Sequence, residues 1–140
     1  MTTTSPSDAD RAAVAAVPQR VVDAWAEHDA EAFAGVFTED GSMILPGLYR
    51  KGRQEIRSFM AEAFEGPFKG TQVTGRPIDI RFLSETTGVL ITQGGVLAPG
   101  ETEVSPERAA ALVCAVAYPR ITRAEWGHHF PGMPYEPPCR

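Results

Sequence analysis

Apolar side chains recur at helical spacing in the middle of the chain, between Arg53 and Gly66. They occupy positions i, i+3, i+4, i+7 and i+8, which lie along one side of a helix, and the stretch ends in Gly66-Pro67, a pair typical of a helix terminus. With a lead-in from Arg50, the pattern predicts an amphipathic helix. Its buried side consists of Ile56, Phe59, Met60, Ala63 and Phe64.

A second helical pattern lies near the N-terminus. Asp8 or Asp10 is the expected N-cap. Pro18 predicts a kink or a short break, since proline lacks an amide N–H and clashes with the preceding turn. Asp29 then caps a short helix from Ala30 to Val36. The apolar side of the first helix carries Ala13, Val14, Val17, Val21, Val22 and Trp25.

In two regions the spacing of apolar residues changes from that of a helix to that of a strand. After the turn residues Glu39-Asp40-Gly41, alternation predicts a strand from Ser42 to Leu45, ended by Pro46-Gly47. From Thr71 onward, short apolar segments are separated by glycine, proline and polar residues, and such short links predict antiparallel hairpins. The predicted strands are Thr71–Gly75, Asp79–Leu83 and Val89–Gln93, followed by a loop or bulged strand end at Gly94-Gly95.

The C-terminal part contains two kinds of sequence. Arg108 to Tyr118 is apolar throughout, which fits either a strand buried on both faces or a short helix, and we predict a strand. Residues 119–140 are dense in proline and glycine without a period, so we expect an irregular tail. With residues 1–7 as a disordered tail, a single domain is predicted over residues 8–118.

The order of these elements defines the fold class. Helices come first and strands later, without alternation of the two, which indicates an α+β domain with helices packed on one face of a curved antiparallel sheet. A chain of 140 residues has the length of one domain. The net charge of -5 and the lack of a basic run argue against a nucleic-acid or anionic-membrane partner.

The cysteines and the N-terminus bear on the cellular setting. Two cysteines are too few for a disulfide framework, and Cys114 lies in an apolar run, where a buried free thiol is typical. The N-terminus lacks the features of a signal peptide, and no window approaches the roughly 18 apolar residues of a membrane span. We therefore expect a cytoplasmic protein.

Several phrases of the sequence resemble a known superfamily. They are AWAEHDAEAFAGVFTEDGSMILPG, YRKGRQEIRSFMAEAF, KGTQVTG, TQGGVLAPGE and SPERA, within residues 10–108. Together they resemble the nuclear-transport-factor-2-like (SnoaL-like) superfamily, and within it the SgcJ/EcaC group, which is found in gene clusters for enediyne polyketides. The resemblance implies a cone-shaped, cystatin-like roll that encloses a pocket between its sheet and its helices.

The resemblance stops near residue 109. Members of the group continue with a strand containing a tryptophan, an Asp-Gly turn and a last strand near a Gln-Asn pair, and none of these occurs in Ala109–Arg140. One hypothesis is a changed reading frame near residue 109. It implies a sheet that is incomplete at its C-terminal end.

The resemblance implies a protein that binds an apolar polyketide intermediate and assists biosynthesis by cyclisation, proton transfer or protection. Two alternatives stay open: a non-catalytic ligand-binding module, and a dimerisation module, since homodimers are common on this fold. Enzymatic activity is thus left open. No cofactor is expected, because Gly94-Gly95 does not open a helix as a phosphate-binding loop does.

Asp40 and Tyr49 are the candidates for catalysis. A buried Asp40 carboxylate would act as a proton-transfer base, and Tyr49 would hydrogen-bond a ligand carbonyl; turn formation and packing are the alternative roles. The steroid-isomerase mechanism known on this fold is excluded. The resemblance places Val21 and Leu45 where that mechanism needs a tyrosine and a general base.

Large apolar side chains are the candidates for lining the pocket, because ligand pockets are lined mainly by such groups. A metal site is not expected, since His128, His129 and Cys139 match no spacing of zinc ligands that we recognise. The candidate ligand-binding residues are Trp25, Phe33, Phe37, Met43, Leu45, Phe59, Met60, Phe64 and Phe82.

Overall fold

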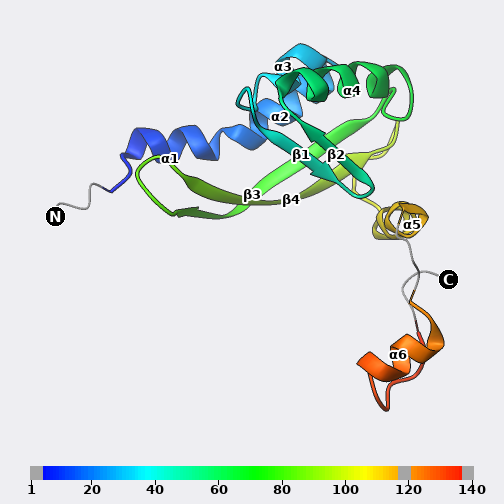
Figure 1. The fold of residues 1–140 in the computed structure, drawn as a ribbon. Coiled ribbons are helices and arrows are strands. Elements are labelled where there is room, and N and C mark those ends of the chain that lie inside the picture. Colours follow the sequence, from blue (N-terminus) through cyan, green and yellow to red (C-terminus); the bar gives the residue numbers. More distant parts are fainter. Residues whose placement is uncertain (1–4, 117–120, 137–140) are drawn as a thin grey trace. The chain divides into compact units, whose positions relative to one another are not determined.

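The computed structural model describes residues 5–116 and 121–136. Two compact units are formed, one by the chain up to Met43 with Arg50–Val104, the other by Ile44–Tyr49 with the chain from Ser105 onward. Figure 1 shows the elements. They are α1 (Asp8–Ala15), α2 (Val17–Ala26), α3 (Ala30–Ala34), β1 (Ser42–Leu45), β2 (Leu48–Lys51), α4 (Arg53–Glu65), β3 (Gln72–Phe82), β4 (Gly88–Leu97), α5 (Pro106–Val116) and α6 (Arg123–His129).

The N-terminal helical segment is interrupted as predicted. Helix α1 ends at Ala15 and α2 begins at Val17, with Pro18 in the first turn of α2. A proline is tolerated there because the first amides of a helix have no partner within the helix. The predicted cap of α1 is wrong: the N-cap is Ser7, whose hydroxyl accepts a hydrogen bond from the Asp10 amide, while the Asp10 carboxylate accepts one from the Ser7 amide.

The short helix α3 is capped as predicted. The Asp29 carboxylate accepts a hydrogen bond of 2.9 Å from the Ala32 amide. His28, between α2 and α3, has a positive φ of 50°, which reverses the chain between the two helices. The helix ends at Ala34 rather than at the predicted Val36, because the amides of Val36 and Phe37 form tighter turns with the third preceding carbonyl.

Strands β3 and β4 form an antiparallel hairpin longer than predicted. The separate strands expected at Thr71–Gly75 and Asp79–Leu83 are one strand, which continues through Pro77 by an irregularity between Pro77 and Asp79. Gly94-Gly95, expected to form a loop or a bulged strand end, is part of β4. A Cβ atom on Gly94 would lie 2.0 Å from a β3 backbone oxygen, so glycine allows the two strands to pair closely there.

Strand β1 has its predicted bounds, but its partner β2 was not predicted. The sequence suggested that residues 50–53 lead directly into a helix. Residues 48–51 instead form β2, which pairs with β1 through the turn at Pro46-Gly47, where Gly47 has a φ of 73°, and α4 begins at Arg53. The described strands therefore form two separate two-stranded sheets, β1-β2 and β3-β4.

Helix α5 occupies the segment predicted as a strand, so that prediction is wrong over Arg108–Val116; residues 117 and 118 lie outside the described chain. The alanines at 109–111 favour a helix, and the Ser105 hydroxyl accepts a hydrogen bond of 3.1 Å from the Arg108 amide. Cys114 is disulfide-bonded and half-buried, which corrects the expected free thiol. Cys139 lies outside the described residues.

Helix α6 lies within residues 119–140, where the sequence predicts irregular chain. A capping box explains its formation: the Thr122 hydroxyl accepts a hydrogen bond from the Glu125 amide, and the Glu125 carboxylate accepts one of 2.7 Å from the Thr122 amide. Trp126 packs against Phe130 and Tyr135, with ring centroids 4.6 and 6.0 Å apart. Local capping and aromatic packing thus order this short segment.

The core of the first unit surrounds Trp25. Its indole ring lies 5.4 Å from the Phe64 ring and 4.8 Å from the Phe68 ring, measured between centroids. The indole N–H donates a buried hydrogen bond of 2.9 Å to the Thr71 hydroxyl. Ile56 and Met60 of α4 are fully buried beside this cluster of apolar residues. The buried side predicted for α4 is therefore confirmed at Ile56, Met60, Ala63 and Phe64, whereas Phe59 is only half-buried.

The helices α1 and α2 pack on one face of the β3-β4 hairpin (Figure 1). Gly75 of β3 faces Pro18 of α2, where a Cβ would make ordinary contact at 3.6 Å. The Arg11 guanidinium of α1 lies over the Phe82 ring at 5.3 Å. The predicted α+β class, with N-terminal helices on antiparallel strands, is confirmed.

Candidate functional site

The predicted pocket wall lies mostly in the core of the first unit. Trp25, Phe33, Met43 and Met60 have between 0% and 6% of their surface exposed. Trp25 and Phe33 meet edge to face, with centroids 5.9 Å apart. These side chains pack against one another, so their burial stabilises the fold whether or not a ligand is bound.

The remaining predicted wall residues have different surroundings. Phe37 is half-buried against Phe33, with centroids 5.8 Å apart, and Phe64 is buried beside Trp25. Phe82 is half-buried under the Arg11 guanidinium. Leu45, at the end of β1, has 39% of its surface exposed.

The two predicted catalytic residues are both exposed to solvent. Asp40 lies in the turn before β1, where its carboxylate accepts a hydrogen bond of 3.0 Å from the Thr38 hydroxyl. The Gly41 amide donates to the Thr38 carbonyl, which closes the same turn. This arrangement favours the turn-forming role of Asp40. Tyr49 lies in β2 with 57% of its surface exposed.

The same turn is tied to the start of α4. The Gly52 amide donates to the Gly41 carbonyl at 2.7 Å, and the Arg53 amide donates to the Glu39 carbonyl at 3.0 Å. The Arg53 guanidinium also donates to the Phe37 carbonyl. Three connections thus hold the turn at residues 39–41 against the start of α4. They fix the position of this end of the helix.

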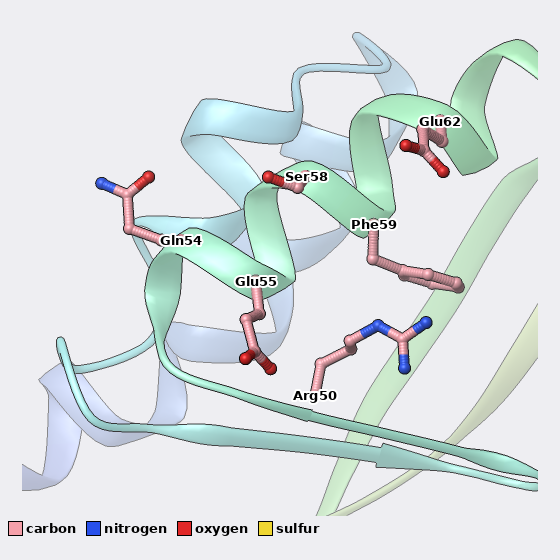
Figure 2. Close-up of a pocket in the computed structure, with 6 residues that line it drawn as sticks. All are labelled: Arg50, Gln54, Glu55, Ser58, Phe59 and Glu62. Carbon is pink, nitrogen blue, oxygen red and sulfur yellow. The ribbon is translucent and has the colours of Figure 1, made fainter.

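An open depression of about 530 Å³ lies along the solvent side of α4 (Figure 2). Phe59 forms its apolar part, and the guanidinium of Arg50, which comes from β2, lies 5.1 Å from the Phe59 ring centroid. Of the predicted ligand-binding residues, Phe59 lines this depression. The full lining is Arg50, Gln54, Glu55, Ser58, Phe59 and Glu62.

Polar groups surround the Phe59 ring in the depression. The Glu55 carboxylate accepts a hydrogen bond of 3.0 Å from the Lys51 amide, which holds it toward β2. The side chains of Ser58 and Glu62 form no hydrogen bond with any residue in the described part of the chain, and both residues are exposed. Their hydroxyl and carboxylate are therefore available to a ligand in this depression.

The sequence reasoning missed the polar residues of the depression. Gln54, Ser58 and Glu62 recur every fourth residue, so they lie on one side of the helix, with Phe59 at the border of its apolar side. This polar row is a usable signal, but a solvated helix face has the same pattern. The contribution of Arg50 depends on the hairpin that the sequence did not predict.

The described residues hold neither a metal-binding cluster nor a helix that could span a membrane. Across residues 5–116 and 121–136, no three His, Cys, Asp or Glu residues are arranged to hold a metal ion. The rings of His128 and His129 lie 5.0 Å apart and nearly perpendicular. No helix in the same ranges combines the length and apolarity needed to cross a bilayer.

Comparisons with known proteins identify the family. The model of the SnoaL-like domain matches residues 19–117, so the chain belongs to this family, which is part of the nuclear-transport-factor-2-like superfamily. It is similar to a crystal structure of a domain of unknown function with a cystatin-like fold from Nostoc punctiforme PCC 73102, with a TM-score of 0.67 and 34% identity. The match covers 71% of this chain and 62% of that one. A search of curated proteins finds no match.

Proposed function

We propose that the protein binds a small polyketide-type molecule and assists the biosynthesis of a natural product. The proposal rests on membership of the SnoaL-like family together with the depression on α4. A volume of about 530 Å³ falls within the range of about 300–1,000 Å³ that small-molecule sites occupy. The single observation that carries the proposal is the aromatic ring in this depression, with a cation over it and polar groups around it.

The lining favours a flat, conjugated ligand with hydroxyl groups. Such a ligand gains apolar contact with the half-buried Phe59 ring and electrostatic contact with the Arg50 guanidinium. Its hydroxyl groups would donate hydrogen bonds to the carboxylates of Glu55 and Glu62. The combination of one apolar ring with a few polar groups fits a polyketide better than a purely aliphatic molecule.

The more specific form of the proposal is a role in enediyne-type polyketide biosynthesis. It is supported by the resemblance of residues 10–108 to the SgcJ/EcaC group. Three roles are considered: cyclisation, proton transfer and protection of a reactive intermediate. Asp40 is retained as the candidate for proton transfer, Tyr49 as the candidate for a hydrogen bond to a ligand carbonyl, and a homodimer as the assembly.

Binding without turnover is the second candidate function, and a specific observation favours it. Proton transfer at neutral pH is served by a carboxyl group whose pKa is raised by burial. Asp40, Glu55 and Glu62 are all exposed. Protection or carriage of a ligand needs no such group, so the depression is better suited to it.

Fluorescence binding tests the proposal with parinaric acid, a conjugated polyene, and with a dihydroxyanthraquinone as probes. We expect both to bind the wild type, and Phe59→Leu or Arg50→Ala to weaken binding about two- to fivefold, since a cation–π contact at an exposed site contributes about 0.5–1 kcal/mol. The matched controls are Phe82→Leu and Arg11→Ala, which remove a similar pair with a separation of 5.3 Å outside the depression. Equal effects of the two pairs of variants would refute the site.

A further inference from the structure

The depression along α4 is open on its outer side. Its lining comes from α4, apart from Arg50 of β2 (Figure 2), and belongs entirely to the first unit. Of the lining residues, Phe59 and Arg50 are half-buried. A ligand in this depression therefore rests on α4 along one edge, and its opposite edge stays in water. The remaining lining residues are exposed: Gln54, Glu55, Ser58 and Glu62.

The side chains predicted to enclose a ligand lie in the core instead. Trp25 and Phe33 are each 5% exposed, and Met60 is fully buried. The depression thus offers a ligand one surface, formed by the Phe59 ring and the polar side chains beside it. A larger group attached to the outer edge of the ligand extends away from the first unit without a steric conflict.

Negative charge exceeds positive charge in the lining. It contains the carboxylates of Glu55 and Glu62 and the guanidinium of Arg50. Within the described ranges of the chain, neither carboxylate takes part in an ion pair. The Glu55 carboxylate accepts its hydrogen bond from the backbone amide of Lys51, a neutral group, so its charge is not offset there. The lining therefore disfavours an anionic ligand relative to a neutral ligand of the same shape.

Charge and openness together select among the chemical forms of a polyketide. While the chain is being built, it is joined to the arm of a carrier by a thioester, which is neutral. Hydrolysis of that bond releases the free acid, whose carboxylate is negative at neutral pH. The free acid would bring its charge toward Glu55 and Glu62. The carrier arm needs an open path away from the site, and the outer side of the depression gives that path.

We infer that the ligand is a polyketide still joined by a thioester to its carrier arm, an inference that rests on the proposed function. The acyl part lies against the Phe59 ring, and the arm leaves through the open outer side. The reaction that supplies this ligand is acyl transfer onto a thiol, and the reaction that consumes it is cleavage of the thioester. The protein thus acts before the chain is released from its carrier.

Fluorescence titration with three forms of one polyene tests the inference: parinaric acid, its S-ethyl thioester and its S-pantetheine thioester. Pantetheine is uncharged, so it adds bulk without charge. We expect the two thioesters to have dissociation constants within about a factor of two, because the arm stays outside the depression and loses little freedom. Parinaric acid should bind about two- to fivefold more weakly than either thioester, since one unbalanced like charge near a protein surface changes affinity by about that factor.

Two matched variants of α4 distinguish local charge from net charge. Glu62→Gln removes one carboxylate from the lining and should bring the dissociation constants of the acid and the S-ethyl thioester to about the same value. Glu65→Gln removes the same charge from an exposed residue outside the lining and should preserve the difference. High ionic strength should also reduce the difference in the wild type, because salt screens exposed charges.

The inference and the proposed function fail in different ways. A wild type that binds the acid as tightly as the thioesters, or that binds the S-pantetheine form several-fold more weakly than the S-ethyl form, would overturn the inference and leave the ligand site in place. The same acid-to-thioester ratio in Glu62→Gln and in the wild type would also overturn it. If Phe59→Leu leaves the affinities for all three probes unchanged, the depression is not the site, and the proposed function fails together with the inference.

Discussion

The guanidinium of Arg53 donates two hydrogen bonds to the backbone carbonyl of Phe37, 3.0 Å from Nε and 2.5 Å from Nη2. This carbonyl follows α3, where helical hydrogen bonding has ended, and the bond joins it to the first residue of α4. This side chain thus joins the segment between α3 and the turn at residues 39–41 to the helix that carries the depression.

Replacing Arg53 by alanine should lower the free energy of unfolding by about 2 kcal/mol, because hydrogen bonds from a charged group contribute about 1.5–3 kcal/mol. Urea denaturation measures the change. Arg57→Ala is the matched control one turn later: its ion pair with Glu31 is 3.5 Å long and exposed, so the loss should stay below about 1 kcal/mol. Equal losses for the two variants would contradict the role of Arg53.

Thr71→Val should destabilise the first unit by about 1–3 kcal/mol. The substitution leaves the buried Trp25 indole N–H without a partner, and an unsatisfied buried donor costs about that much. Thr71→Ser keeps the hydroxyl and should lose much less. Thermal unfolding followed by near-ultraviolet circular dichroism measures both variants, and similar losses would show that the methyl group, not the hydrogen bond, matters.

Gly94→Ala should destabilise the β3-β4 hairpin by about 2 kcal/mol or more, since the added Cβ would lie 2.0 Å from the Thr74 carbonyl oxygen and the strands must separate. Gly127→Ala is the opposite case. A Cβ there meets nothing within 4 Å, and alanine within a helix should stabilise α6 by about 0.5–1 kcal/mol. Chemical denaturation, with NMR signals from each region, distinguishes the two effects.

The helicity of α6 should fall at acidic pH. Hydrogen bonds from the Thr122 backbone amide and then its hydroxyl lower the pKa of Glu125 below its ordinary value of 4.5. A carboxyl group with a lowered pKa in the folded state stabilises that state above its unfolded pKa, and the effect is lost as pH falls through the folded pKa. The Thr122 amide shift, measured by NMR between pH 6 and pH 2, should follow this titration. Glu125→Gln should abolish that pH dependence.

The sequence predicted the elements whose signals are local. The apolar spacing of α4, the Asp29 cap and the break at Pro18 depend on residues within one or two turns, and the structure has all three. The wrong predictions arise where one sequence pattern fits two kinds of secondary structure. The apolar run from Arg108 fits a strand or a helix, and Pro77 fits a strand end or an irregularity within a strand.

The site was harder to predict than the fold. Aromatic and methionine side chains have the same sequence pattern whether they line a cavity or fill a core, so Trp25 and Met60 could not be distinguished from Phe59. Arg50 joins the depression through β2, which no local signal indicated. The polar row along α4 resembles any solvated helix face.

The reading-frame hypothesis near residue 109 can be tested directly. The match to the SnoaL-like domain extends to residue 117, beyond SPERA, the last phrase that carries the resemblance. Helix α6 also has a complete capping box. Resequencing the coding region decides the matter: an intact frame would make residues 109–140 a genuine C-terminal segment, whose deletion should then change stability.

Each described strand pairs with its neighbour in the sequence, β1 with β2 and β3 with β4. Local pairing of this kind favours rapid folding, because little chain entropy is lost before the contacts form. The principal partners of Trp25, including Thr71, also precede β4. During synthesis, the central part of the first unit can therefore fold while the segment after Val104 is still emerging from the ribosome.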